Sequence, residues 1–141
     1  MELPDNVYSQ IAVLSERGKR ALDAGDGAGA IRVWRQALDL LPPPQQQWEA
    51  AMWLHASMGD AFRAEGNEDK ALEQFQAAAA SDGGGTNPFV QISLGATLYD
   101  LGRTKEARDS LLRAYMLEGN DIFGAFGGPY LDYLKAEKLV D

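Results

Sequence analysis

The chain has 141 residues, a length at which one domain can bury its own hydrophobic core. It contains no cysteine, which excludes disulfide bonds and thiolate metal sites. Its formal net charge of −8 argues against nucleic acid or an anionic membrane as the ligand, because both would repel it, and favours a protein partner with a basic face.

A first pair of helices is expected between residues 6 and 41. The first helix is predicted by apolar and small residues at helical spacing, which are Val7, Ile11, Leu14, Gly18, Ala21 and Leu22. Gly25 and Gly27 interrupt this pattern, and Asp26 between them is placed to cap the second helix. The second helix continues to Leu41, and the three prolines at positions 42–44 end it.

Two further pairs of helices follow in the same manner. The second pair begins near Gln45 and turns at residues 65–67, where Asn67 would cap its second helix. The glycines at positions 83–85 end that helix. The third pair begins at Asn87 and Pro88, a combination typical of a capped helix start, and ends near Gly119.

The remaining residues are expected to form a loop over residues 122–129 and then a capping helix. A stack of helix pairs leaves the apolar face of its last pair open, so a final helix is needed to cover that face. The side chains available for this purpose are Tyr130, Leu131, Tyr133, Leu134 and Leu139.

The three helix pairs share one spacing of small and large residues. A glycine and an alanine recur twelve positions apart, and a large residue follows four positions later. The three sets are Gly18, Ala30 and Trp34; Gly59, Ala71 and Phe75; and Gly95, Ala107 and Leu111. The small residues would let the two helices of a pair approach closely, and the large ones would fill the space between neighbouring pairs.

This spacing resembles the tetratricopeptide pattern, W-x2-L-G-x2-Y…A-x3-F…P. The resemblance implies an all-α fold, a right-handed α-solenoid of three helix-turn-helix repeats at about residues 7–44, 45–85 and 87–120, with a C-terminal cap at 122–141. These parts would form a single domain over residues 1–141. Such arrays are binding surfaces and rarely carry out chemistry.

The resemblance also implies where a partner would bind. In this family the first helix of each repeat lines the concave face, which places the following candidate partner-binding residues there: Lys19, Trp53, Asp60, Arg63, Phe89, Ile92 and Tyr99. Trp53 is the strongest candidate, because large aromatic side chains dominate binding hot spots. Trp48 lies close by in sequence, so one indole is expected to pack inward while another faces out; the alternative is that both pack in the core or against the linker.

One subset of the family holds a C-terminal carboxylate with a clamp of Lys and Asn. Here Ser15 and Lys19 occupy the first two clamp positions of the first repeat. The clamp is therefore not formed, and a peptide bound through its C-terminal carboxylate is not expected.

Three segments carry a second resemblance: LLPPPQQQWEAAMWLHASMGDAF, GGGTNPFVQISLGATLYDLG and RAYMLEGNDIFGAFGGPYLDYLK. They are similar to small bacterial tetratricopeptide proteins found beside secreted polymorphic toxins. In that group the tail contains an acidic stretch. Here residues 124–128 (GAFGG) stand in place of that stretch. The resemblance implies a role as the immunity protein that binds and neutralises a cognate toxin domain.

No catalytic pattern stands out. His55, the only histidine, occupies the Trp position of the repeat motif and is expected to pack between helices. Residues 25–29 (GDGAG) lack the Lys-Ser/Thr end of a phosphate loop. Neither an enzyme activity, nor a cofactor, nor a metal site is therefore expected.

Three non-catalytic functions remain open. The leading interpretation is a protein–protein interaction module, in its sharpest form a bacterial immunity protein; the alternatives are a secretion chaperone and a self-associating scaffold. The acidic charge suits a toxin with a basic cleft, although solubility alone would also explain it. The N-terminal segment MELPDNVYSQ does not resemble a secretory signal, and the apolar stretches are short, so a cytoplasmic location is expected.

Overall fold

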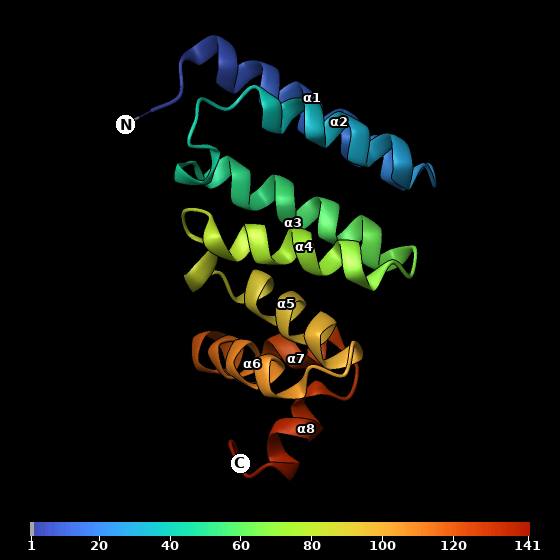
Figure 1. Cartoon of the computed structure of the whole chain (residues 1–141), viewed down its shortest axis with the longest axis vertical. Coiled ribbons are helices and arrows are strands. Elements are labelled where there is room, and N and C mark those ends of the chain that lie inside the picture. The colour runs from blue at the N-terminus through green and yellow to red at the C-terminus, as the bar shows by residue number, and fades with distance from the viewer. Residues whose placement is uncertain (1) are drawn as a thin grey trace.

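The computed structural model describes residues 2–141, and this part of the chain forms helices without any strand. Three helix pairs follow one another down the long axis, with the two ends of the chain far apart (Figure 1). The pairs are α1 (Asp5–Asp23) with α2 (Gly27–Asp39), α3 (Glu49–Ala64) with α4 (Glu68–Ala80), and α5 (Pro88–Asp100) with α6 (Thr104–Glu118). The short helices α7 (Asn120–Phe126) and α8 (Tyr130–Ala136) complete the stack, and the 3-10 turns η1 (Gln45–Gln47) and η2 (Gly84–Thr86) precede α3 and α5.

Each of the six long helices packs against the next one along the chain, so the stack is continuous from α1 to α6. One contiguous core runs through it, from Ile11 in α1 to Leu134 in α8. No helix within residues 2–141 is both long and apolar enough to cross a bilayer.

Local side-chain caps fix the starts of α2, α4 and α5, as the sequence predicts. The carboxylate of Asp26 accepts a hydrogen bond of 2.8 Å from the backbone N–H three residues later. The side-chain oxygens of Asn67 and Asn87 accept the corresponding bonds at 3.3 and 3.0 Å. Each cap satisfies a backbone donor that would otherwise lack a partner in the first turn, so α2, α4 and α5 begin where the sequence predicts.

Inside each pair, the large motif residue lies directly over the motif glycine. These contacts join Gly18 to Trp34, Gly59 to Phe75, and Gly95 to Leu111. A methyl group on Gly59 would lie 2.6 Å from a Phe75 ring carbon, too close for packed carbons. The prediction that these large residues fill the space between neighbouring repeats is therefore incomplete, because each of them packs against the glycine of its own repeat.

The prediction of a loop over residues 122–129 is wrong for most of this segment. Residues 120–126 form α7, and only residues 127–129 connect it to α8. Phe123 is buried and packs against Tyr115 of α6, with 6.3 Å between ring centroids. This burial stabilises the helix despite Gly124, whereas Gly127 and Gly128 have φ values of 81° and 83° and end it.

Candidate partner-binding groove

The inner surface is defined here by the faces of α1, α3 and α5, the first helices of the three pairs. The structure places the predicted partner-binding residues of this surface in three different environments. Lys19, Trp53 and Phe89 are exposed, Trp53 by 48% and Phe89 by 39%. Asp60, Arg63 and Tyr99 are half-buried, and Ile92 is buried.

The prediction that Ile92 lies on the binding surface is wrong. Its side chain is 0% exposed and belongs to the core. The residues from Val90 to Leu98 are all buried, because α4, α6 and α7 pack around α5. The sequence is consistent with this burial, since the helix has no charged residue before Asp100, as expected of a helix that is buried along most of its length.

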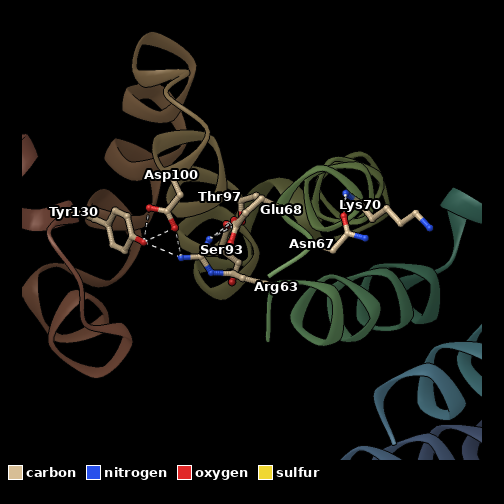
Figure 2. A network of polar contacts seen from close by, with 8 residues as sticks. All are labelled: Arg63, Asn67, Glu68, Lys70, Ser93, Thr97, Asp100 and Tyr130. Atoms are coloured by element: carbon tan, nitrogen blue, oxygen red, sulfur yellow. Dashed lines mark hydrogen bonds and ion pairs between the residues drawn. The ribbon is translucent and has the colours of Figure 1, made fainter. Parts of the chain in front are cut away.

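The guanidinium of Arg63 ties α3 to α5 and to the C-terminal cap (Figure 2). Its Nη2 lies 2.8 Å from Asp100 Oδ2 and donates a hydrogen bond of 2.7 Å to the Tyr130 hydroxyl. Its Nη1 donates to Thr97 Oγ1 at 3.1 Å and to Glu68 Oε2 at 3.2 Å. We call these five residues the Arg63 network.

The donors and acceptors of the Arg63 network complement one another. The Tyr130 hydroxyl accepts from Arg63 and lies 3.0 Å from each oxygen of the Asp100 carboxylate, to which it can donate. Burial lowers the pKa of Arg63, but Tyr130, Asp100 and Glu68 outweigh this effect and raise it. The pKa of Tyr130 is also raised, chiefly by burial. Both groups therefore keep their protons, and the guanidinium of Arg63 makes its ion pairs and hydrogen bonds within the chain.

Aromatic side chains next to the Arg63 network pack the C-terminal cap against the third repeat. Tyr99 meets the rings of Tyr130 and Tyr133 edge-on, at centroid distances of 5.5 and 5.1 Å. Phe126 lies against Tyr130 at 5.8 Å and under the Arg63 guanidinium at 5.8 Å. The C-terminal cap thus covers the inner surface between α3 and α5, and Tyr99 contributes to its packing.

The inner surface is open between α1 and α3. Two hollows of about 780 and 490 Å³ lie there, and Trp53 borders both of them. Leu54 and Ala12 also border both, and the larger hollow reaches the N-terminal ends of α1 and α3. We call this pair of hollows the α1–α3 groove.

Of the two neighbouring tryptophans, one packs inward and the other faces out, as the first of the two interpretations predicts. Trp48 is buried, and its indole N–H donates a 2.8 Å hydrogen bond to the carbonyl of Pro42. Trp53 faces the groove, and its indole N–H donates to Glu49 Oε1 at 3.3 Å. The Glu49 carboxylate therefore holds the Trp53 indole at the edge of the groove.

Carboxylates outnumber cations around the groove. Its acidic lining residues are Glu2, Asp5, Glu16, Glu49, Asp60 and Asp82, and its one basic lining residue within residues 2–141 is Lys19. Burial raises the pKa of Asp60 to about 6, opposed by the charge of Arg63 one turn further along α3. The groove consequently has an acidic lining near neutral pH.

Several of these lining residues are not among the candidates predicted from the sequence. Tyr8 lies one turn before Ala12 on the same stripe of α1, and Glu49 lies one turn before Trp53 on α3. Extending each predicted stripe by one turn toward the N-terminus would have found both residues. Asp82 comes from the α4–α5 connection, and no periodic signal in the sequence places it there.

The structure gives His55 a packing role. Its Nδ1 lies 2.8 Å from Gln74 Oε1, which joins α3 to α4 within one repeat. Across residues 2–141, no group of three His, Cys, Asp or Glu side chains is arranged to hold a metal ion.

No protein-family model and no curated protein sequence matches the chain. Solved structures do resemble it. The type III secretion chaperone SycD of Yersinia enterocolitica, in complex with a peptide of the translocator YopD, is 20% identical, with 99% of this chain and 98% of that chain covered and a TM-score of 0.71. The C-terminal TPR-containing domain of an FK506-binding protein of Plasmodium falciparum is 17% identical over 99% and 98% of the two chains, with a TM-score of 0.73.

A third structure, the first TPR domain of Spaghetti (RPAP3) bound to an HSP90 peptide, is 18% identical over 94% of this chain and 98% of that chain, with a TM-score of 0.71. Identities this low establish likeness of fold alone. With the stacked helix pairs described above, they show that the chain has the α-solenoid fold of tetratricopeptide repeats.

Proposed function

We propose that this protein is a non-catalytic interaction module that binds a protein partner with a basic face in the α1–α3 groove. The observation that carries the proposal is the exposed indole of Trp53 at the junction of the two hollows. An exposed large aromatic side chain that borders a recess is typical of a binding hot spot. The Arg63 network leaves this groove as the open part of the inner surface.

The similar structures support a peptide or protein as the ligand. SycD was solved with a translocator peptide, and the Spaghetti domain with a peptide of HSP90. The HSP90 peptide ends in the acidic sequence EEVD. The acidic lining of the α1–α3 groove favours the opposite charge in the partner of this protein.

In its sharpest form, the proposal is that the chain acts in the bacterial cytoplasm as an immunity protein. The resemblance of three segments to toxin-associated tetratricopeptide proteins is one support. The net charge of −8 is another, because toxin domains that act on nucleic acids or nucleotides carry basic clefts. Electrostatic attraction would then speed capture of the toxin.

A secretion chaperone is the second candidate, and the likeness to SycD over nearly the full length of both chains favours it. The two functions differ in the state of the ligand. An immunity protein binds a folded toxin domain, whereas a chaperone holds an extended, unfolded segment.

The test is co-purification with the tagged protein from its own cells, followed by titration with the purified partner and growth of cells that express both. Recovery of a folded C-terminal domain of a large secreted protein, with rescue of growth, is the expected result. Recovery of secretion substrates that bind only when unfolded would favour the chaperone. Failure of any recovered protein to bind in a two-component titration would contradict both candidates.

A further inference from the structure

The larger hollow of the α1–α3 groove combines negative charge, aromatic rings and an apolar floor. From this combination we infer that it takes a segment of the partner protein that carries arginine or lysine beside an apolar side chain. The inference rests on the proposed function and adds the chemistry and location of the bound segment.

Four carboxylates surround the larger hollow: Glu2, Asp5, Glu49 and Asp82. Within residues 2–141, none of them forms an ion pair, and neither lysine nor arginine lines this hollow. They come from the N-terminal segment, the first turns of α1 and α3, and the α4–α5 connection. The fold therefore gathers negative charge from three separate parts of the chain, and no lysine or arginine within residues 2–141 lines the hollow to balance it.

Aromatic rings lie among these carboxylates. Tyr8 is 66% exposed and lies on α1, and Trp53 lies on α3. A guanidinium or ammonium group between them would meet a ring face as well as a carboxylate, and both contacts favour a cation. The hydrogen bond from the Trp53 indole to Glu49 holds ring and carboxylate together before any ligand arrives.

The floor of the same hollow is apolar, formed by Leu3, Ile11, Trp48 and Leu54. It would bury a neighbouring aliphatic side chain of the segment. A cation alone would leave this floor in water, so a mixed basic and apolar segment fits better than a small polyamine.

A second copy of the chain is a poor occupant of the groove. Both copies carry a net charge of −8, so they repel each other as whole molecules. The chain's own C-terminus lies at the other end of the stack, far from α1 (Figure 1). Charge complementarity therefore favours a basic segment from a different protein.

The test uses two labelled peptides of about twelve residues, the length scale of a segment spanning a helix-lined groove. One alternates arginine with alanine around a central leucine, and the other has glutamate in place of arginine. We expect the arginine peptide to bind, to quench or shift the fluorescence of exposed Trp53, and to weaken as salt is added. Equal binding of the glutamate peptide, or no binding of the arginine peptide at low salt, overturns the inference.

Two double variants locate the site. Glu49→Gln with Asp82→Asn removes two charges from the hollow, and the glutamine oxygen can still accept the Trp53 bond. Glu73→Gln with Asp109→Asn removes two exposed charges on α4 and α6, away from the groove. The first variant is expected to weaken the arginine peptide roughly two- to thirtyfold and the second less than about twofold.

Equal weakening by the two variants would show attraction to net charge alone and would overturn the inference. Failure of this inference can be told apart from failure of the proposed function. If Trp53→Ala weakens the natural partner while Glu49→Gln/Asp82→Asn leaves it unchanged, groove binding stands and the basic segment is excluded.

Discussion

Asp60 lines the groove, and its pKa is shifted by its surroundings. Its carboxyl lies half-buried in the lining of the smaller hollow, and burial raises its pKa from 3.8 to about 6. Arg63 on the same helix opposes this rise, but its guanidinium is directed to Asp100 and Tyr130. The ionised form of Asp60 is therefore tolerated at a cost in stability.

A first prediction concerns this cost. The folded protein holds the Asp60 proton more tightly than the unfolded chain, so its contribution to stability decreases as pH rises from about 4 to about 6. Asp60→Asn is expected to be more stable than the wild type at pH 8, by about 1–3 kcal/mol, with the difference vanishing toward pH 4. Urea unfolding at several pH values measures it, with the exposed Asp109→Asn as control. A difference independent of pH would contradict the burial of an ionised Asp60.

At the scale of elements, the repeats are held by one large side chain over one glycine. Phe75 is fully buried against Gly59, whereas Phe89 on the next helix is 39% exposed. Phe75→Ala is therefore expected to lower the free energy of unfolding by about 3–5 kcal/mol, as large-to-small core changes do. Phe89→Ala is the matched control and should cost about 1 kcal/mol or less. Similar losses in chemical denaturation for both variants would show that the repeat contact does not dominate.

The C-terminal cap depends on the Arg63 network. Tyr130→Phe removes the hydroxyl that lies between Arg63 and Asp100, and leaves two partly exposed charged groups with one partner fewer. We expect a loss of about 1–3 kcal/mol and faster amide exchange in α7 and α8 than in α3 and α4. Tyr133→Phe loses only an exposed hydrogen bond to a backbone carbonyl and should change little. Unchanged exchange in Tyr130→Phe would mean that the ring alone holds the cap.

The sequence predicts elements well where their causes are local. Asp26, Asn67 and Asn87 cap helices through bonds to an amide three residues away, so the residue types alone reveal them. The sequence does not predict helix α7, because Gly124 within it and Gly127 and Gly128 after it favour a loop, while the burial of Phe123 against Tyr115 depends on tertiary packing. The starts of α2, α4 and α5 are thus set by short-range chemistry, and α7 by a contact between helices.

The same distinction explains the site. The exposure of Trp53 follows from its position on an amphipathic helix, which the repeat spacing predicts. The engagement of Arg63 by Tyr130 joins residues 67 positions apart, and the covering of Tyr99 by the cap also joins residues that are not neighbours in the sequence. Local patterns carry no information on such contacts, so the sequence could not separate the open half of the inner surface from the covered half.

Over the whole molecule, the solenoid presents an acidic, aromatic groove at its N-terminal half and a closed, hydrogen-bonded end at its C-terminal half. The central claim is that partner binding is located in the α1–α3 groove. It is tested with two variants of exposed apolar residues: Trp53 in the groove, and Met116 on α6, which is 81% exposed and outside the groove lining.

The decisive measurement is calorimetric titration of wild type, Trp53→Ala and Met116→Ala with the partner recovered by co-purification, together with the melting midpoint of each variant. We expect Trp53→Ala to weaken binding by about tenfold or more and Met116→Ala by less than about twofold, as for a hot-spot and a peripheral residue. Melting midpoints should remain close, because both side chains are exposed in the free protein. Undiminished binding by Trp53→Ala, with the fold intact, would place the partner elsewhere and contradict the account.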